Sequence, residues 1–167
     1  MIAHNEETTV GKMIEGLLKS YPKEILEILI VDDASTDRTA AIAKSWAASN
    51  PKVKLIQRTP PCGVGRALQT GFKNIHPQAD YCLTMDSDFI ENIVQVNSMI
   101  LAIEDNNYDG IIGSRFIKGG RLINYPLTKK IMNRLFHAII KIIFGVRQKD
   151  LTNNFKLYKT AVFKNIR

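Results

Sequence analysis

The chain has 167 residues, of which 45% are hydrophobic and 23% are charged, so it is long enough for one globular domain with a substantial core. Its net charge of +7 is unevenly distributed: residues 1–114 carry 10 Lys and Arg against 15 Asp and Glu, whereas residues 115–167 carry 13 against 1. Such a basic segment favours an anionic membrane surface or a phosphate group as partner, and the lack of zinc-ligand spacings and nucleic-acid motifs argues against nucleic acid.

The cysteine content and the hydropathy pattern predict a cytoplasmic location. Cys62 and Cys82 are too few and too isolated for a disulfide framework, which suits a reducing compartment. The sequence has neither a secretory signal nor a run of about 18 uncharged apolar residues that could span a bilayer. We therefore expect any contact with a membrane to be peripheral, at its inner face.

Strand-like and helix-like segments alternate along the first 114 residues. A first helix follows a cap at Thr8 or Thr9, and later helices are predicted from Ser35 to about Ser49, from Gly63 to about Ile75 and from Asn92 to Glu104. The predicted strands cover residues 25–31, 53–57, 80–85 and 110–114. This alternation predicts an α/β fold with a mostly parallel sheet flanked by helices.

No repeat, low-complexity linker or composition shift marks a domain boundary, so we expect residues 1–167 to form a single domain. Only Met1 and Ile2 precede the first polar turn. The first strand is therefore expected to be very short.

Acidic turns follow three of the apolar runs: Asn5-Glu6-Glu7, Asp32-Asp33 and Asp86-Ser87-Asp88. The carboxyl ends of parallel strands meet at one edge of a sheet, where open α/β folds bind ligands, so these turns are expected to converge. Acids placed there can hydrogen-bond a base or ribose and hold a divalent cation that neutralises a diphosphate. Each turn taken alone could instead be a helix cap, but their convergence favours a ligand site.

Gly63-Val64-Gly65 opens the third predicted helix and has two interpretations. Glycines at a helix start can let backbone N–H groups approach an anion, or they can simply supply a loop that needs unusual dihedral angles. The segment lacks the full spacing of a dinucleotide fingerprint and the Lys-Ser/Thr of a P-loop. The structural role is therefore the preferred interpretation.

A basic amphipathic helix is predicted from Leu127 to Phe144. Its apolar residues recur at helical spacing and are Ile131, Met132, Leu135, Phe136, Ile139, Ile140, Ile142, Ile143 and Phe144. Its polar positions carry Lys129, Lys130, Arg134, His137 and Lys141. The helix either packs its apolar side on the core or lies on the surface of an anionic membrane.

Six blocks of sequence, in a fixed order, cover nearly the whole chain. They are residues 3–7 (AHNEE), 30–39 (IVDDASTDRT), 63–68 (GVGRAL), 85–88 (MDSD), 113–116 (GSRF) and 150–158 (DLTNNFKLY). Together they resemble the family-2 glycosyltransferases of GT-A fold, and among these the polyprenyl-phosphate sugar synthases typified by dolichyl-phosphate mannose synthase. The resemblance implies a GT-A, Rossmann-like, mostly parallel sheet flanked by helices. Measured against the family pattern, the first strand is expected to be truncated, with an amino-terminal strand and a carboxyl-terminal extension missing from residues 1–167.

The resemblance also implies roles for individual positions. The residues that match nucleotide-binding positions are Ile2, His4, Glu6, Ile30 and Asp32. Asp86, Asp88 and Arg115 match catalytic positions: Asp86 faces the sugar nucleotide, Asp88 ligates Mg²⁺ or Mn²⁺ with help from Asp86, and Arg115 lies near the phosphates. The residues implied on the acceptor and phosphate side are Arg134, Asp150, Thr152 and Lys156.

The implied activity is transfer of a sugar, with inversion, from a nucleotide-diphosphate donor (GDP-mannose or a UDP-sugar) to a polyprenyl phosphate. A lipid phosphate is already an anionic nucleophile at neutral pH, so the reaction needs no side-chain general base. It needs in-line positioning and charge neutralisation at the leaving diphosphate.

Two other classes fit part of the sequence. One is a truncated, non-catalytic glycosyltransferase-like module that binds nucleotide or membrane. The other is a receiver-type signalling domain, which would also show Val31-Asp32-Asp33 at a strand end but should carry a phospho-acceptor Asp after the next strand, where Gln57-Arg58 stands instead.

Overall fold

The structure is a computed structural model that describes residues 1–114, 132, 136, 139–140, 143–145, 150 and 153–165. The chain divides into two compact units: unit 1 combines Met1–Ile111 with Phe155–Arg167, and unit 2 is Ile112–Asn154. Three of the predicted site residues, Arg115, Arg134 and Thr152, lie outside the described residues. Most of the predicted amphipathic helix lies outside them as well.

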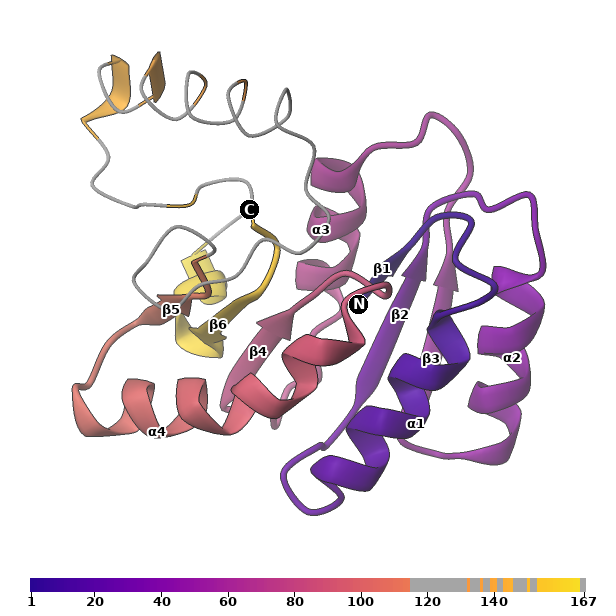
Figure 1. Cartoon of the computed structure of the whole chain (residues 1–167), viewed down its shortest axis with the longest axis horizontal. Helices are drawn as coiled ribbons and strands as arrows, with labels where there is room; N and C mark the ends of the chain where they lie inside the picture. The colour runs from indigo at the N-terminus through magenta and orange to yellow at the C-terminus, as the bar shows by residue number, and fades with distance from the viewer. Residues whose placement is uncertain are drawn as a thin grey trace. The chain divides into compact units, whose positions relative to one another are not determined.

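Three parallel strands form the first sheet of unit 1 (Figure 1). β2 (Ile28–Asp32) lies between β1 (Ile2–Ala3) and β3 (Val53–Gln57). The central strand is apolar, β-branched and almost completely buried, as expected for a parallel strand with helices on both faces. Because Asp32 pairs with Ala3 on one side and with Gln57 on the other, the three strands end at the same level.

A second sheet continues from β1 at a single bridge. β6 (Lys156–Lys159) lies between β4 (Tyr81–Thr84) and β5 (Gly110–Ile112), and it runs antiparallel to β4. Beyond β4 the chain stays extended, so that Ile2 forms a parallel bridge with Asp86 and donates its N–H to the Met85 carbonyl at 3.4 Å. The strand order across both sheets is therefore β3-β2-β1-β4-β6-β5.

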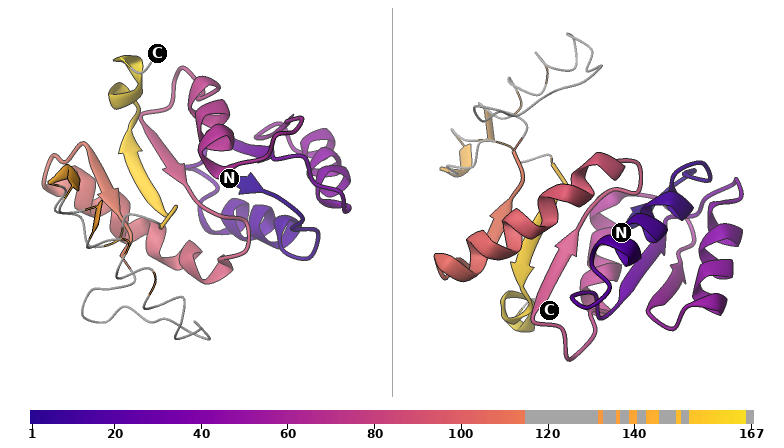
Figure 2. Two further views of the ribbon diagram at one scale, coloured as in Figure 1. Left: turned by 90° about the horizontal axis from the view of Figure 1, so that it is seen from above. Right: turned by 60° about the horizontal axis from the view of Figure 1, so that its bottom comes forward.

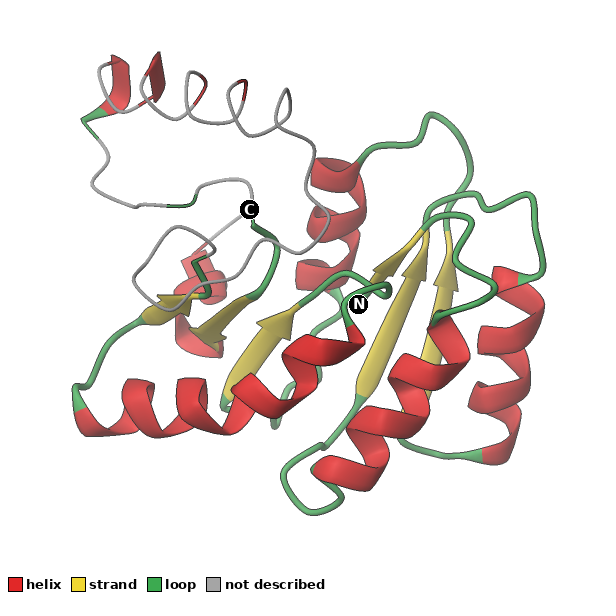
Figure 3. Cartoon of the chain, in the orientation of Figure 1, coloured by secondary structure: helices red, strands yellow, loops and turns green. Residues whose placement is uncertain are grey.

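Helices alternate with the strands of unit 1 and cover both faces (Figure 3). α1 (Val10–Ser20) packs against α2 (Thr39–Ser49) and the 3₁₀ helix η1 (Ile90–Gln95), which leads into α4 (Val96–Asp105). α3 (Val64–Lys73) covers the opposite face from α1 and α4 (Figure 2). The buried core draws on both sheets and on α1, α2, η1 and α4, and it includes Val10, Met13, Ile14, Leu17, Ile30, Met85, Val96, Met99, Ile103 and Leu157.

A tyrosine joins the end of α1 to the η1–α4 junction. The Tyr21 hydroxyl donates to the Ile93 carbonyl at 2.7 Å and accepts the Asn97 N–H at 3.3 Å. Both partners are main-chain groups at the point where the 3₁₀ helix becomes an α-helix, so this hydroxyl stabilises the start of α4.

Two predicted boundaries are wrong for a local reason. The strand predicted from Ile25 begins at Ile28, because the Ile25 N–H turns back to the Tyr21 carbonyl at 3.1 Å. The helix predicted from Ser35 begins at Thr39, because side chains of neighbouring turns accept the preceding N–H groups. Side-chain acceptors of this kind compete with helical hydrogen bonds.

Other elements differ in kind. The helix predicted from Asn92 to Glu104 is a 3₁₀ turn followed by a shorter α-helix. The prediction omitted β6 and the 3₁₀ helix η2 (Thr160–Asn165) that follows it. β3 was predicted with its observed bounds, Val53–Gln57.

Within the described part of the chain, no helix combines the length and the apolar character needed to cross a membrane.

Candidate functional site

The carboxyl edge of the strands in unit 1 gathers the predicted acidic turns. The parallel register places the end of β1 beside the end of β2, and the bridge between Ile2 and Asp86 places the end of β1 beside the end of β4. The Asp33 N–H also donates to the Ala3 carbonyl at 2.8 Å, which extends the pairing by one residue. The predicted convergence of the three turns is therefore confirmed in position.

Hydrogen bonds tie the turn after β1 to the turn after β2. Asn5, at φ +58°, accepts the Thr36 N–H on its side-chain oxygen at 2.8 Å. The Glu6 N–H donates to the Thr39 hydroxyl at 2.7 Å, and the Glu7 N–H donates to the Asp37 carboxylate at 3.1 Å. This network gives the two turns one geometry before any ligand binds.

Asp37 and Glu6 both accept hydrogen bonds from residues at the start of a helix. Desolvation by itself would raise the pKa of the Asp37 carboxyl, but hydrogen bonds from Thr39 and from the Glu7 backbone outweigh it, so this pKa is lowered. Glu6 accepts the Thr9 hydroxyl on its carboxylate at 2.7 Å. Glu6 therefore bonds to the side chain of the N-cap residue of α1, in addition to its place at the ligand edge.

Asp32 and Asp33 follow one another but have different environments. Asp32 is 1% exposed and accepts the Ser35 N–H at 3.4 Å. Asp33 is 3% exposed; it forms an ion pair with Arg58 and accepts the Gly63 N–H on its other oxygen at 2.6 Å. Asp33 therefore holds the loop between β3 and α3, whereas Asp32 supports its own turn.

The Asp86-Ser87-Asp88 turn is anchored through its middle residue. Ser87 is 1% exposed, and its hydroxyl donates to the Ile2 carbonyl at 3.2 Å. The carboxylates on either side are more exposed than this serine. The turn is thus fixed to β1 by a serine and presents its acids at the edge of the sheet.

Asp88 lies in a negative environment. Desolvation, followed by the negative charges of Glu6 and Asp86, raises the pKa of the Asp88 carboxyl above its usual range. Glu91 adds a smaller effect of the same sign. Carboxylates that repel one another in this way are the arrangement that a bound cation would stabilise.

The acids fit a divalent cation that shares its ligands with a substrate. Among the residues that the structure describes, no three His, Cys, Asp or Glu side chains group closely enough to hold a metal alone. Mg²⁺, however, is commonly bound through one or two carboxylates together with substrate phosphates and water. Asp86 and Asp88 are the residues of unit 1 that could supply those carboxylates.

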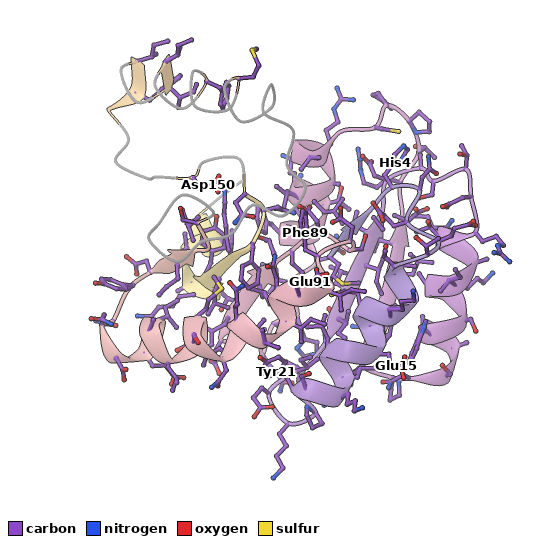
Figure 4. The ribbon with its side chains drawn as sticks, in the orientation of Figure 1. His4, Glu15, Tyr21, Phe89, Glu91 and Asp150 are labelled. Carbon is purple, nitrogen blue, oxygen red and sulfur yellow. The ribbon has the colours of Figure 1, made fainter. Side chains whose placement is uncertain are left out.

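The predicted nucleotide-binding residues occupy three kinds of position. His4 is exposed beyond β1, and its Nδ1 lies 2.8 Å from the Asp33 carbonyl (Figure 4). Ile2 uses both of its main-chain groups in contacts with Met85 and Ser87, so only its side chain is available to a ligand. Ile30 is fully buried in the core, where its side chain serves packing.

The acceptor-side residues are divided between the units. Lys156 belongs to unit 1, where it pairs with Thr84 and its carbonyl accepts the Thr84 hydroxyl at 3.3 Å. Lys156 therefore lies beside Thr84, the last residue of β4, and Thr84 precedes Asp86 by two residues. In unit 2, Asp150 is buried and accepts the Asn153 N–H at 3.2 Å, while the Asn153 side chain donates to the Gly113 carbonyl at 2.6 Å.

Sequence reasoning assigned no role to Asp33, Arg58 and Ser87, although the sequence contained a signal for Asp33 and for Ser87. Successive side chains of an extended chain point to opposite sides, so adjacent acids in Asp32-Asp33 cannot share one role. The same alternation sets Ser87 apart from its flanking acids. Gly63 is likewise resolved: its N–H is used by Asp33 and its φ is +156°, which supports the structural interpretation of this glycine.

Comparison with curated proteins finds enzymes of polyprenyl-phosphate mannosylation. The chain is 28% identical over 164 residues to undecaprenyl-phosphate mannosyltransferase of Micrococcus luteus, covering 98% of this chain and 66% of the relative. It is 29% identical over 165 residues to polyprenol monophosphomannose synthase of Mycolicibacterium smegmatis, covering 98% and 61%. It is 37% identical over 131 residues to dolichol-phosphate mannosyltransferase of Pyrococcus furiosus, covering 78% and 36%. The chain thus spans less than two thirds of the length of these relatives.

Solved structures agree on the fold. Glucosyl-3-phosphoglycerate synthase of Mycobacterium tuberculosis superposes with a TM-score of 0.69 at 17% identity, covering 97% of this chain and 57% of that one. Its complex with Mn²⁺ and UDP-glucose gives 0.66 at 18% identity, covering 96% and 55%. These likenesses show a GT-A fold. The model of the family described as glycosyl transferase family 2 matches residues 1–167, and the chain belongs to that family.

Proposed function

We propose that this protein transfers a sugar from a nucleotide-diphosphate donor, GDP-mannose or a UDP-sugar, to a polyprenyl phosphate with inversion. The observation that carries the proposal is the group of acids at the carboxyl edge of β1, β2 and β4, in which desolvation and then the charges of Glu6 and Asp86 raise the pKa of Asp88. The curated relatives are named for mannosyl transfer to polyprenyl phosphates. The receiver-type alternative is not retained, because the family model covers residues 1–167.

The donor side of the proposal rests on unit 1. Asp32 and His4 stand at the ends of adjacent strands, where a nucleoside would lie across the edge of the sheet. Asp86 and Asp88 stand at the end of β4, on the diphosphate side. A bound Mg²⁺ or Mn²⁺ would supply charge neutralisation for the leaving diphosphate.

The reaction does not require a side chain to accept or donate a proton. An oxygen of the acceptor phosphate forms the bond to the anomeric carbon, while the bond from that carbon to the nucleoside diphosphate breaks. The nucleophile is already anionic, so the residues of the site bind, orient and exclude water. We propose that Arg115 and Arg134 assist at the phosphates, and that Lys156, Asp150 and Thr152 serve the acceptor side.

A peripheral location on the cytoplasmic face of a membrane completes the proposal. Residues 115–167 carry 13 Lys and Arg against a single acid, which suits an anionic surface. Most of the described apolar residues of the segment predicted as an amphipathic helix are exposed, with Ile140 half-buried. The exposed ones are Met132, Phe136, Ile139, Ile143 and Phe144. Exposed apolar side chains beside many basic ones are typical of interfacial segments.

The test combines nucleotide binding with transfer. The purified chain is titrated calorimetrically with GDP and with UDP, each with and without Mn²⁺, and is assayed for transfer from the matching nucleotide sugar to polyprenyl phosphate. Asp88→Asn should weaken Mn²⁺-dependent binding at least about tenfold, or about 1.4 kcal/mol. Asp105→Asn, the same change at the exposed end of α4, is the control and should bind as the unmodified chain does.

Each result has a definite meaning. Metal-dependent binding of one nucleotide, with transfer, supports the enzyme and selects the donor. Binding without transfer favours a non-catalytic glycosyltransferase-like module. If a folded chain transfers sugar equally well with Asp88→Asn, the assignment of Asp88 fails.

A further inference from the structure

One carboxylate at the ligand edge has both of its oxygens committed to the protein. Oδ1 of Asp33 pairs with the Arg58 guanidinium, and Oδ2 accepts the Gly63 N–H at 2.6 Å. The Asp33 residue is 3% exposed and the Arg58 side chain is 14% exposed. A ligand at this edge therefore has little access to the Asp33 carboxylate.

The partners of Asp33 are the two ends of one loop. Arg58 directly follows β3, and Gly63 is the residue before α3. Between them lie Pro60 and Pro61, which have no N–H with which to anchor the loop. Residues 59–62 are exposed. The Asp33 carboxylate is thus a clamp that joins the start of the loop to its end.

The clamp stands directly beside the proposed nucleoside position. The Arg58 N–H donates to the Asp32 carbonyl at 2.8 Å, so the loop starts against Asp32. On the other side, the His4 ring bonds to the Asp33 carbonyl. Residue 33 therefore connects the turn after β1, the turn after β2 and the loop after β3.

We propose that Asp33 is a positioning residue for the donor nucleotide. By holding Arg58 and Gly63, its carboxylate keeps the loop of residues 58–63 as a wall of the nucleotide site, and nucleotide affinity depends on this clamp although the carboxylate itself contacts no ligand. The inference rests on the proposed function, because it concerns the same donor site. It adds a residue whose effect is transmitted through the loop.

The experiment must separate positioning from stability. Asp33→Ala removes the carboxylate from the half-buried Arg58 guanidinium and should lower the melting temperature. The double variant Asp33→Ala/Arg58→Met removes both charges and should regain most of that loss, since neutral replacements of buried ion pairs are often tolerated. Neither variant can hold the Gly63 N–H. Asp80→Ala, at an exposed position just before β4, is the control.

Three quantities are measured for each variant: the melting temperature, amide hydrogen exchange of the peptide covering residues 58–66, and the Kd for GDP and UDP with Mn²⁺. We expect faster exchange and a Kd raised about tenfold in both Asp33 variants, even where the melting temperature recovers. The control should match the unmodified chain in all three quantities.

Recovery of nucleotide affinity together with the melting temperature in the double variant would overturn the proposal, because Asp33 would then act through stability alone. Unchanged exchange across residues 58–66 would overturn it as well. Failure of the proposed function looks different: the unmodified, folded chain would bind neither nucleotide. The dependence of affinity on Asp33 would then be rejected, and hydrogen exchange would still report whether Asp33 holds the loop.

Discussion

At the scale of single residues, the carboxylates at the strand ends differ by their surroundings. Asp33 pairs with the Arg58 guanidinium and with a backbone N–H. For Asp88, by contrast, desolvation and to a smaller extent the neighbouring acids raise the pKa of the carboxyl. The first arrangement stabilises a charged group and the second destabilises one. A charge that is unfavourable in the free protein is expected where a cation binds.

The raised pKa of Asp88 has a consequence for stability. A carboxyl with a raised pKa binds its proton more tightly in the folded than in the unfolded state, so its contribution to stability falls as pH rises through that pKa. Without metal, Asp88→Asn should therefore melt about 1 to 2 °C above the unmodified chain at pH 7. This difference should vanish below about pH 4, where ordinary carboxyls are protonated. The check is to measure the melting temperatures of both proteins across pH with a chelator present. An equal difference in melting temperature below about pH 4 and at pH 7 would refute the prediction.

At the scale of elements, the pairing of β5 with β6 depends on a residue without a side chain. A Cβ on Gly110 would lie 2.8 Å from Tyr158 Cδ1 and 3.3 Å from the Leu157 carbonyl oxygen. Tyr158 in turn packs edge-on against Phe72 and Phe163, so its ring has limited freedom to move. The close approach of the two strands therefore requires glycine.

We expect Gly110→Ala to destabilise the protein by about 1 to 3 kcal/mol, because it overpacks this contact. Gly65→Ala is the matched control: no atom lies within 4 Å of its added Cβ, and Gly65 is in the first turn of α3. Alanine is the better helix former, so this control should be neutral or stabilise by up to about 1 kcal/mol. Urea denaturation of the two variants gives both values. Equal stabilities would contradict the proposed contact.

At the scale of the whole molecule, unit 1 is assembled from distant parts of the chain. Its core joins Ile103 of α4 and Leu157 of β6 to residues of α1 and β2. β6, which comes last in the sequence, therefore lies between β4 and β5 rather than at the edge of the sheet. Such long-range pairing means that α4 and β6 are stable only as part of the complete core.

The core predicts a contrast between two positions of α4. Ile103 has no exposed surface, whereas Leu101 is 51% exposed. Ile103→Ala should lower the free energy of unfolding by about 2 to 5 kcal/mol, because it removes buried contacts and leaves a cavity. Leu101→Ala should change it by less than about 0.5 kcal/mol. Chemical denaturation followed by circular dichroism measures both, and similar losses would show that α4 is not packed as described.

Sequence alone determined the alternation of strands and helices and the collection of acidic turns at one edge, because both follow from local hydrophobic pattern and from the geometry of parallel strands. β3 was predicted to the residue for the same reason. The GT-A fold class came instead from the resemblance of six sequence blocks to the family-2 glycosyltransferases. The roles of the site residues stay predictions, and Arg115, Arg134 and Thr152 lie outside the described residues.

Only the tertiary structure decided that β6 enters between β4 and β5, that Asp33 rather than Asp32 clamps the loop of residues 58–63, and that Ser87 anchors the turn between two acids. Each of these depends on a partner between 25 and 85 residues away in the sequence. Local propensity is set by near neighbours along the chain, whereas these contacts are set by which segments the folded core brings together.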